Sequence, residues 1–187
     1  LPGDHVLDLG CGSGTHFVWI ADLIGHEGRI VGYDPDDQNL DSARTRIAGR
    51  PEEQRITLRQ GQLSGELPFE DGEFDVVWCA GSLQYLPDPL EAIREMMRVV
   101  RPGGRVAVQD VEMHSMLLGP MPDDLLIALK SCLPRGWTGP DEQGWVDWLV
   151  GHKLRTYCMQ AGLREVRGVL RNRVYVPPFT DDERGFL

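Results

Sequence analysis

The feature that most constrains the fold is a cluster of glycines close to the start of the chain. Residues 5–10 are an apolar run typical of a buried strand, and residues 17–24 have the apolar spacing of a helix. Between them the chain reads DLGCGSG, with Gly10, Gly12 and Gly14 in alternate positions. Such a loop lets the backbone pass close to a ligand and brings that ligand to the free N–H groups of a helix. It is also compatible with a tight turn that binds nothing.

The same alternation of strand and helix continues along the chain. Four further strands are predicted over residues 29–34, 55–59, 74–79 and 105–109. One helix follows a cap at Asp36 or Asp37, and its Leu40, Ala43 and Ile47 share a face. Another starts at the cap Asp88, with Leu90, Ile93, Met97 and Val100 on one face, and is predicted to break at residues 102–104. This alternation indicates βαβ units and a parallel sheet covered on both faces.

The second half of the chain is less regular. Apolar spacing predicts one helix around residues 125–132 and another that reaches about residue 162. Residues 166–176 are predicted to form a closing pair of strands. We therefore expect an α/β fold, Rossmann-like and doubly wound, with a mostly parallel seven-stranded sheet and an antiparallel closing strand. No repeat or linker divides the chain, so residues 1–187 are expected to form a single domain.

Charge and cysteine content limit the partners and the compartment. The chain has 19 basic and 29 acidic residues and a net charge of -10, whereas a nucleic-acid-binding protein needs a positive surface. No apolar stretch approaches the roughly 20 residues of a membrane span, and no signal peptide is visible. The four cysteines lie far apart without a CxxC pair, which is typical of free thiols in the cytoplasm. No residues have metal-ligand spacing.

Two details of the glycine loop favour a particular ligand. Its spacing is G-x-G-x-G after an acidic residue, whereas the dinucleotide fingerprint is G-x-G-x-x-G. Asp34 ends the predicted second strand, about 20 residues past the loop, where a carboxylate can accept hydrogen bonds from both hydroxyls of a ribose. An ordinary surface carboxylate is the alternative at that position.

Residues 6–14, VLDLGCGSG, resemble the first motif of the class I S-adenosylmethionine-dependent methyltransferases. Residues 30–34, 67–77 and 98–105 resemble further motifs of that family in the same order. As a set they are similar to the small-molecule group that includes the ubiquinone and menaquinone C-methyltransferases. The resemblance implies that residues 1–110 bind the cofactor and that residues 111–187 supply substrate-side helices and closing strands. Because the chain begins directly before the first strand, we also expect an N-terminal cap to be missing.

The resemblance also implies roles for individual residues. Gly10 and Gly12 would lie along the methionine part of S-adenosylmethionine, with Asp8 near its amino group. Asp34 would hold the ribose and Pro35 would lie against the adenine. Gln62 stands where the family commonly has an aspartate that contacts the adenine amine. The full predicted set of cofactor-binding residues is Asp8, Gly10, Cys11, Gly12, Gly14, Asp34, Pro35, Gln62, Leu63, Ala80 and Gly81.

Methyl transfer from a sulfonium is an in-line displacement, to which an enzyme contributes mostly by holding the reactants in line. His114 and Tyr85 are the candidate catalytic residues, because they follow the predicted fifth and fourth strands. A solvated loop histidine and a packing tyrosine are the alternatives, and relatives often carry histidine in place of Tyr85. Three tryptophans of the second half, Trp137, Trp145 and Trp148, either line an apolar substrate pocket or pack the late helices.

The expected function is methyl transfer from S-adenosylmethionine to a small, apolar or aromatic metabolite. One rival is a module that binds this cofactor without doing chemistry. Another is a nicotinamide-dependent oxidoreductase, which suits Asp34 but not the loop spacing. The sequence decides neither the acceptor atom nor the oligomeric state.

Overall fold

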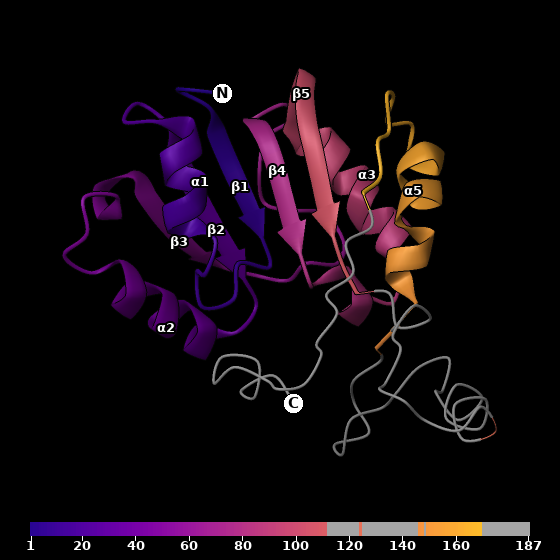
Figure 1. Cartoon of the computed structure of the whole chain (residues 1–187), viewed down its shortest axis with the longest axis horizontal. Coiled ribbons are helices and arrows are strands. Elements are labelled where there is room, and N and C mark those ends of the chain that lie inside the picture. Colours follow the sequence, from indigo (N-terminus) through magenta and orange to yellow (C-terminus); the bar gives the residue numbers. More distant parts are fainter. Residues whose placement is uncertain (112–123, 125–145, 148, 170–187) are drawn as a thin grey trace.

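A computed structural model of the chain describes residues 1–111, 124, 146–147 and 149–169. Its centre is a five-stranded sheet in which every neighbouring pair of strands is parallel, in the order β3-β2-β1-β4-β5. The strands are β1 (His5–Leu9), β2 (Arg29–Asp34), β3 (Ile56–Gln60), β4 (Phe74–Ala80) and β5 (Val100–Gln109). Figure 1 shows all five arrows pointing toward the same edge of the sheet. The parallel α/β architecture is therefore confirmed over the first half of the chain.

Helices cover both faces of this sheet. They are α1 (Phe17–Ile24), α2 (Asp37–Ile47), α3 (Pro89–Val99) and α5 (Val150–Ala161), together with short 3-10 turns at Glu53–Arg55 and Leu83–Tyr85. Successive side chains of β1 point to opposite faces, so Val6 packs in one buried core and Leu7 in another. The core around Val6 lies under α1 and α2, and the core around Leu7 lies under α3 and α5. This double cover explains why the inner strands β1, β2 and β4 are buried or half-buried over nearly all of their length.

Local sequence signals set the ends of the helices. The Asp36 side chain accepts a hydrogen bond from the Gln38 N–H, and Asp88 accepts one from Glu91 with Pro89 at the first helical position. Gly25 ends α1, as its position after the last apolar residue predicts. The buried faces of α1 and α2 consist of the predicted residues, namely Phe17, Ile20, Ala21, Ile24, Leu40, Ala43 and Ile47.

The prediction for α3 is wrong in its phase and in its end. The buried face carries Ile93, Met96 and Val99, so Met97 and Val100 lie beside the core rather than at its centre. The helix ends at Val99, before the Pro-Gly-Gly segment, and that segment lies within β5. Residues 101–104 are an irregularity of the strand, because Phe74 pairs with Val100 while Val76 pairs with Arg105.

The predicted elements of the second half are described only in part. The helix expected to reach residue 162 is present as α5, which ends in a left-handed Gly162. The helix expected around residues 125–132 lies outside the described residues. Residues 166–169, the start of the expected closing strands, are in no strand, and residues 170–176 lie outside the described part. No helix among the described residues is both long and apolar enough to cross a membrane.

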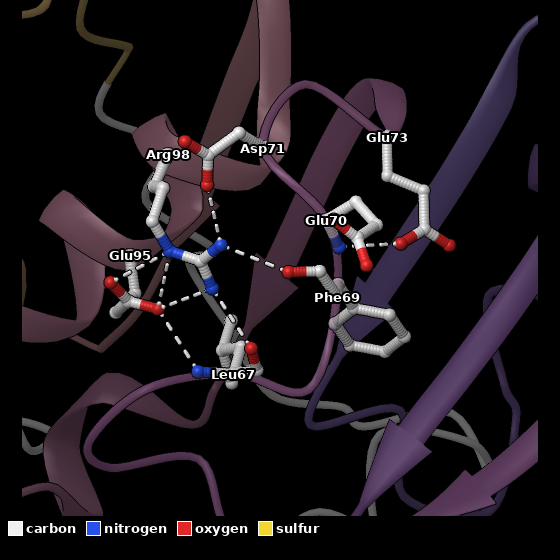
Figure 2. A network of polar contacts seen from close by, with 7 residues as sticks. All are labelled: Leu67, Phe69, Glu70, Asp71, Glu73, Glu95 and Arg98. Atoms are coloured by element: carbon white, nitrogen blue, oxygen red, sulfur yellow. Dashed lines mark hydrogen bonds and ion pairs between the residues drawn. The ribbon is translucent and has the colours of Figure 1, made fainter.

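An irregular loop, residues 61–73, connects β3 to β4 and is fastened to α3. Arg98 of α3 donates to the carbonyl oxygens of Leu67 and Phe69 at 2.8 and 2.9 Å, and to the Asp71 carboxylate at 2.8 Å. Glu95 accepts hydrogen bonds from Arg98 and from the Leu67 N–H, so both members of this ion pair bind the loop (Figure 2). The anchored loop carries Gln62 and Leu63 at its beginning, close to the end of β3.

Candidate functional site

A cleft of about 670 Å³ lies at the carboxyl ends of the strands, the usual ligand position in open parallel sheets. Four segments form it: the glycine loop, the end of β2, the start of the 61–73 loop and the chain that leaves β4. Its lining includes nearly all of the predicted cofactor residues, namely Gly10, Cys11, Gly12, Asp34, Pro35, Gln62, Leu63, Ala80 and Gly81. Residues separated by up to 71 positions in sequence therefore face one space.

The backbone of Gly10 is fixed in a conformation that favours glycine. Its φ is +75°, and the N–H groups of Gly10 and Cys11 both donate to the Tyr33 carbonyl, at 2.7 and 3.2 Å. A Cβ at Gly10 would collide with the Ser82 side chain, whose hydroxyl donates to the Gly10 carbonyl at 3.3 Å. The loop thus approaches the end of β4 closely, and only a residue without a side chain fits there.

Asp34 joins the glycine loop to the end of β2. Its carboxylate is buried and accepts hydrogen bonds from the Gly12 N–H at 2.8 Å, the Asp36 N–H at 3.0 Å and the Asn39 amide at 3.1 Å. A carboxylate has about four lone-pair sites, so these three bonds orient it without using all of its capacity. Asp34 is therefore both a brace of the loop and an acceptor on the cleft wall.

Asp8 and Gly14 belong to the predicted cofactor set but do not line the cleft. Asp8 lies beneath the loop with 1% of its surface exposed. Gly14 donates its N–H to the Cys11 carbonyl at 3.0 Å, and a Cβ there would press on the Phe17 ring. Gly14 therefore lets α1 begin close to the loop.

The Asp8 carboxyl is in an unusual environment. Neither of its oxygens has a hydrogen-bond partner among the described residues. Burial, and secondarily the negative charge of Asp34, raises the pKa of Asp8 to about 7. A buried polar group without a partner is costly, so a positively charged or hydrogen-bonding group brought into the loop would stabilise it.

Of the two candidate catalytic residues, the structure describes Tyr85 alone. Tyr85 lies in the 3-10 turn after β4 and lines the cleft, with 56% of its surface exposed. The neighbouring Gln84 N–H donates to the Asp110 carboxylate at 3.1 Å, which ties this turn to the end of β5. His114 lies outside the described residues.

His16 and Asn39 are among the cleft residues that are absent from the predicted set. Both lie at the start of helices that follow strand ends, and Asn39 holds the Asp34 carboxylate. The His16 ring packs edge-on against Trp78 of β4, with the ring centres 5.6 Å apart. Burial lowers the pKa of His16. In the sequence, only the short distance from the glycine loop points to His16. That distance does not show on which side of the helix start the cleft lies.

Cysteine and metal-ligating side chains form no further centre in the part of the chain that the structure describes. Cys11, Cys79 and Cys158 are buried free thiols, and burial raises their pKa values. Among the same residues, no three His, Cys, Asp or Glu side chains gather in a way that would hold a metal ion.

Comparison with known proteins places this geometry in a family. A family model described as a methyltransferase domain matches residues 7–108, more than half of the chain. The chain belongs to the methyltransferase-domain family. Within it, this methyltransferase domain is of class I, and its cofactor is S-adenosylmethionine.

Curated relatives match nearly two thirds of this chain. The chain is 36% identical over 115 residues to a demethylmenaquinone methyltransferase of Desulfitobacterium hafniense, covering 62% of this chain and 45% of that protein. It is 35% identical over 115 residues to the methyltransferase GfsG of Streptomyces halstedii, covering 62% and 40%. The chain spans about half or less of the length of these relatives.

A solved structure extends the likeness of fold beyond the matched motifs. A crystal structure of a methyltransferase from Bacillus halodurans superposes with a TM-score of 0.64 at 23% identity. It covers 87% of this chain and 63% of that chain. At this identity the likeness concerns the fold.

The residues of the cleft fit S-adenosylmethionine. The cofactor carries a positive sulfonium and a positive amino group, and the buried Asp8 carboxyl beneath the loop lacks a partner among the described residues. Gly12 also lines the cleft, and nothing lies within 4 Å of a Cβ built on it, so the loop backbone is open to a ligand at this position. Both features suit a cationic ligand that lies along the loop.

Proposed function

We propose that this protein transfers a methyl group from S-adenosylmethionine to a small, apolar or aromatic metabolite. The observation that carries the proposal is the convergence of the glycine loop, Asp34 and the end of β4 on one cleft. In this proposal residues 1–110 bind the cofactor and residues 111–187 supply the substrate side. Family membership supports the reaction class, and the names of the quinone-methylating relatives support the substrate class.

The proposed binding mode places the cofactor along the carboxyl edge of the sheet. The ribose lies at Asp34, whose free acceptor capacity faces the cleft, and the adenine lies between Pro35 and Leu63. Gln62 keeps an acceptor oxygen for the adenine amine, although it lacks the charge of an aspartate. The methionine part passes over Gly10 and Gly12 toward Ala80 and Gly81, above the Asp8 carboxyl.

Methyl transfer depends more on how the acceptor and the methyl group are positioned than on a dedicated base. The acceptor atom of the metabolite forms a bond to the methyl carbon while the carbon–sulfur bond breaks. The electron pair of that bond stays on sulfur, which gives S-adenosylhomocysteine, and the acceptor's proton leaves to solvent or to a nearby group. Tyr85 at the cleft wall is proposed to orient the acceptor by a hydrogen bond, because a phenol is a poor base near neutral pH. His114 is proposed as the proton acceptor.

A turnover assay tests the proposal. The full-length protein is incubated with S-adenosylmethionine and a panel of quinols, phenols and amines, and S-adenosylhomocysteine is measured. We expect acceptor-dependent product with at least one aromatic acceptor, and a lower rate in Tyr85→Phe than in the control Tyr157→Phe on α5. Binding of S-adenosylhomocysteine without turnover across the panel would contradict methyl transfer and favour a module that only binds the cofactor.

A further inference from the structure

The sheet order gives the cleft two distinct ends. Asp34 ends β2 and Gln62 follows β3, on one side of the glycine loop, whereas the His16 ring packs against Trp78 of β4 on the other side. The glycine loop follows β1, the strand between them. A cofactor whose ribose lies at Asp34 and whose chain crosses the loop therefore directs its amino-acid end toward His16. This step rests on the proposed function and its binding mode.

The charges that line the cleft are unbalanced. Asp34 and Asp36 supply negative charge, and no lysine or arginine lines the part of the cleft that the structure describes. Among those lining residues, His16 has the one side chain that can carry a positive charge. The cofactor's amino-acid end bears a carboxylate, which binds best to a charged or N–H donor.

We infer that His16 binds the carboxylate of the cofactor's amino-acid end. A neutral imidazole donates one ring N–H, and a protonated one donates two. The start of α1 favours the same anion, because the first N–H groups of a helix lack partners within the helix. His16 and Asp8 would thus divide the amino-acid end between them, with the imidazole at the carboxylate and the Asp8 carboxyl below the positive groups.

The surroundings of His16 suit a fixed binding group. The ring is half-buried and packs edge-on against Trp78, which packs in the same way against Trp19 with centres 5.6 Å apart. Such aromatic contacts restrict the ring before a ligand arrives, which reduces the entropy lost on binding. A phenylalanine at this position would keep the aromatic packing and lose only the N–H groups.

The test compares two ligands that differ only at the amino-acid end. S-adenosylhomocysteine carries the carboxylate, and 5′-methylthioadenosine has the same nucleoside without the amino-acid group. Calorimetric titration of the full chain is expected to show that His16→Phe weakens S-adenosylhomocysteine by about 10- to 100-fold, the usual effect of a hydrogen bond to a charged group. The affinity for 5′-methylthioadenosine should stay within about twofold, and His16→Gln should recover part of the loss.

Two controls make the result decisive. His26→Phe changes an exposed histidine outside the cleft and should leave both affinities unchanged. Thermal unfolding of each variant checks that the domain is folded. Equal weakening of both ligands, or no weakening of either, in folded His16→Phe would overturn the role of His16 and leave the cofactor assignment standing. Failure of the folded wild-type protein to bind either ligand would overturn both.

Discussion

Asp8 is a buried carboxyl whose environment differs strongly from that of a free side chain. In the folded chain its pKa is about 7 instead of 3.8, because burial and Asp34 disfavour the charge. The folded chain therefore holds a proton that the unfolded chain has lost between these pH values, and stability falls as pH rises through this window. Asp8→Asn removes the titration, so the wild type should lose a few kcal/mol relative to this variant between about pH 4 and pH 8.

Urea unfolding of both proteins across this range measures the difference. Asp22→Asn, at an exposed position on α1, is the control and should follow the wild-type curve. Parallel curves for wild type and Asp8→Asn would mean that Asp8 ionises normally in the folded protein.

Gly10 tests the close approach of the loop to β4. Gly10→Ala places a methyl group 2.7 Å from the Ser82 Cβ at a φ of +75°, and should cost roughly 1–3 kcal/mol of stability. Gly49→Ala is a matched control, because its φ of +71° is similar and nothing lies within 4 Å of the added Cβ. Adding Ser82→Gly should restore part of the loss in Gly10→Ala. Equal losses in the two alanine variants would show that the close contact is unimportant.

The site residues that could be predicted from the sequence are those, such as glycine, whose residue type determines the backbone conformation. Gly10 and Gly12 take positive φ values, which glycine adopts without strain, so a glycine pattern signals the loop directly. His16 carries no such signal, because its place in the cleft depends on packing against Trp78, 62 positions away in sequence. The exclusion of Asp8 from the cleft surface likewise follows from the pleat of β1 and the neighbouring strands.

The element that most directly shapes the adenine side of the cleft is the 61–73 loop. Arg98 holds it through the Leu67 and Phe69 carbonyls, and Arg98→Met would leave these groups without their donor (Figure 2). We expect a loss of roughly 1.5–4 kcal/mol in the free energy of unfolding, measured by urea titration. The affinity for S-adenosylhomocysteine should also fall, because Gln62 and Leu63 begin the same loop.

Arg94→Met is the matched control for this prediction, since Arg94 is exposed on the same helix. It should change stability by less than about 0.5 kcal/mol. If Arg98→Met and Arg94→Met behave alike, the ion-pair network does not hold the loop.

Elements were predictable where a local signal marks them. Caps, apolar periodicity and glycine stops located α1, α2 and the first four strands to within one residue or so. The phase of α3 was not predictable, because its apolar residues fit two adjacent stripes and only packing against α5, β4 and β5 chooses between them. The Pro-Gly-Gly segment reads locally as a break, yet Gly103 at φ +79° lets β5 continue through it.

The described part of the chain joins two buried cores through one sheet, and the proposed cofactor contacts segments at the carboxyl ends of four of its strands. A ligand that binds only the folded chain stabilises it by RT ln(1 + [L]/Kd), about 2.7 kcal/mol at a hundredfold excess over Kd. S-adenosylhomocysteine should therefore raise the Tm by about 5–10 °C for a chain of this size. Differential scanning fluorimetry measures this shift, and adenosine at equal concentration should give a smaller one.

The central claim is that this cleft binds S-adenosylmethionine through Asp34. Its most direct test is calorimetric titration of the folded full chain with S-adenosylhomocysteine, in wild type, Asp34→Ala and the exposed control Asp37→Ala. We predict saturable binding at one site per chain, at least about tenfold weaker in Asp34→Ala and unchanged in Asp37→Ala. No binding by the folded wild-type protein, or equal binding by Asp34→Ala, would contradict the account.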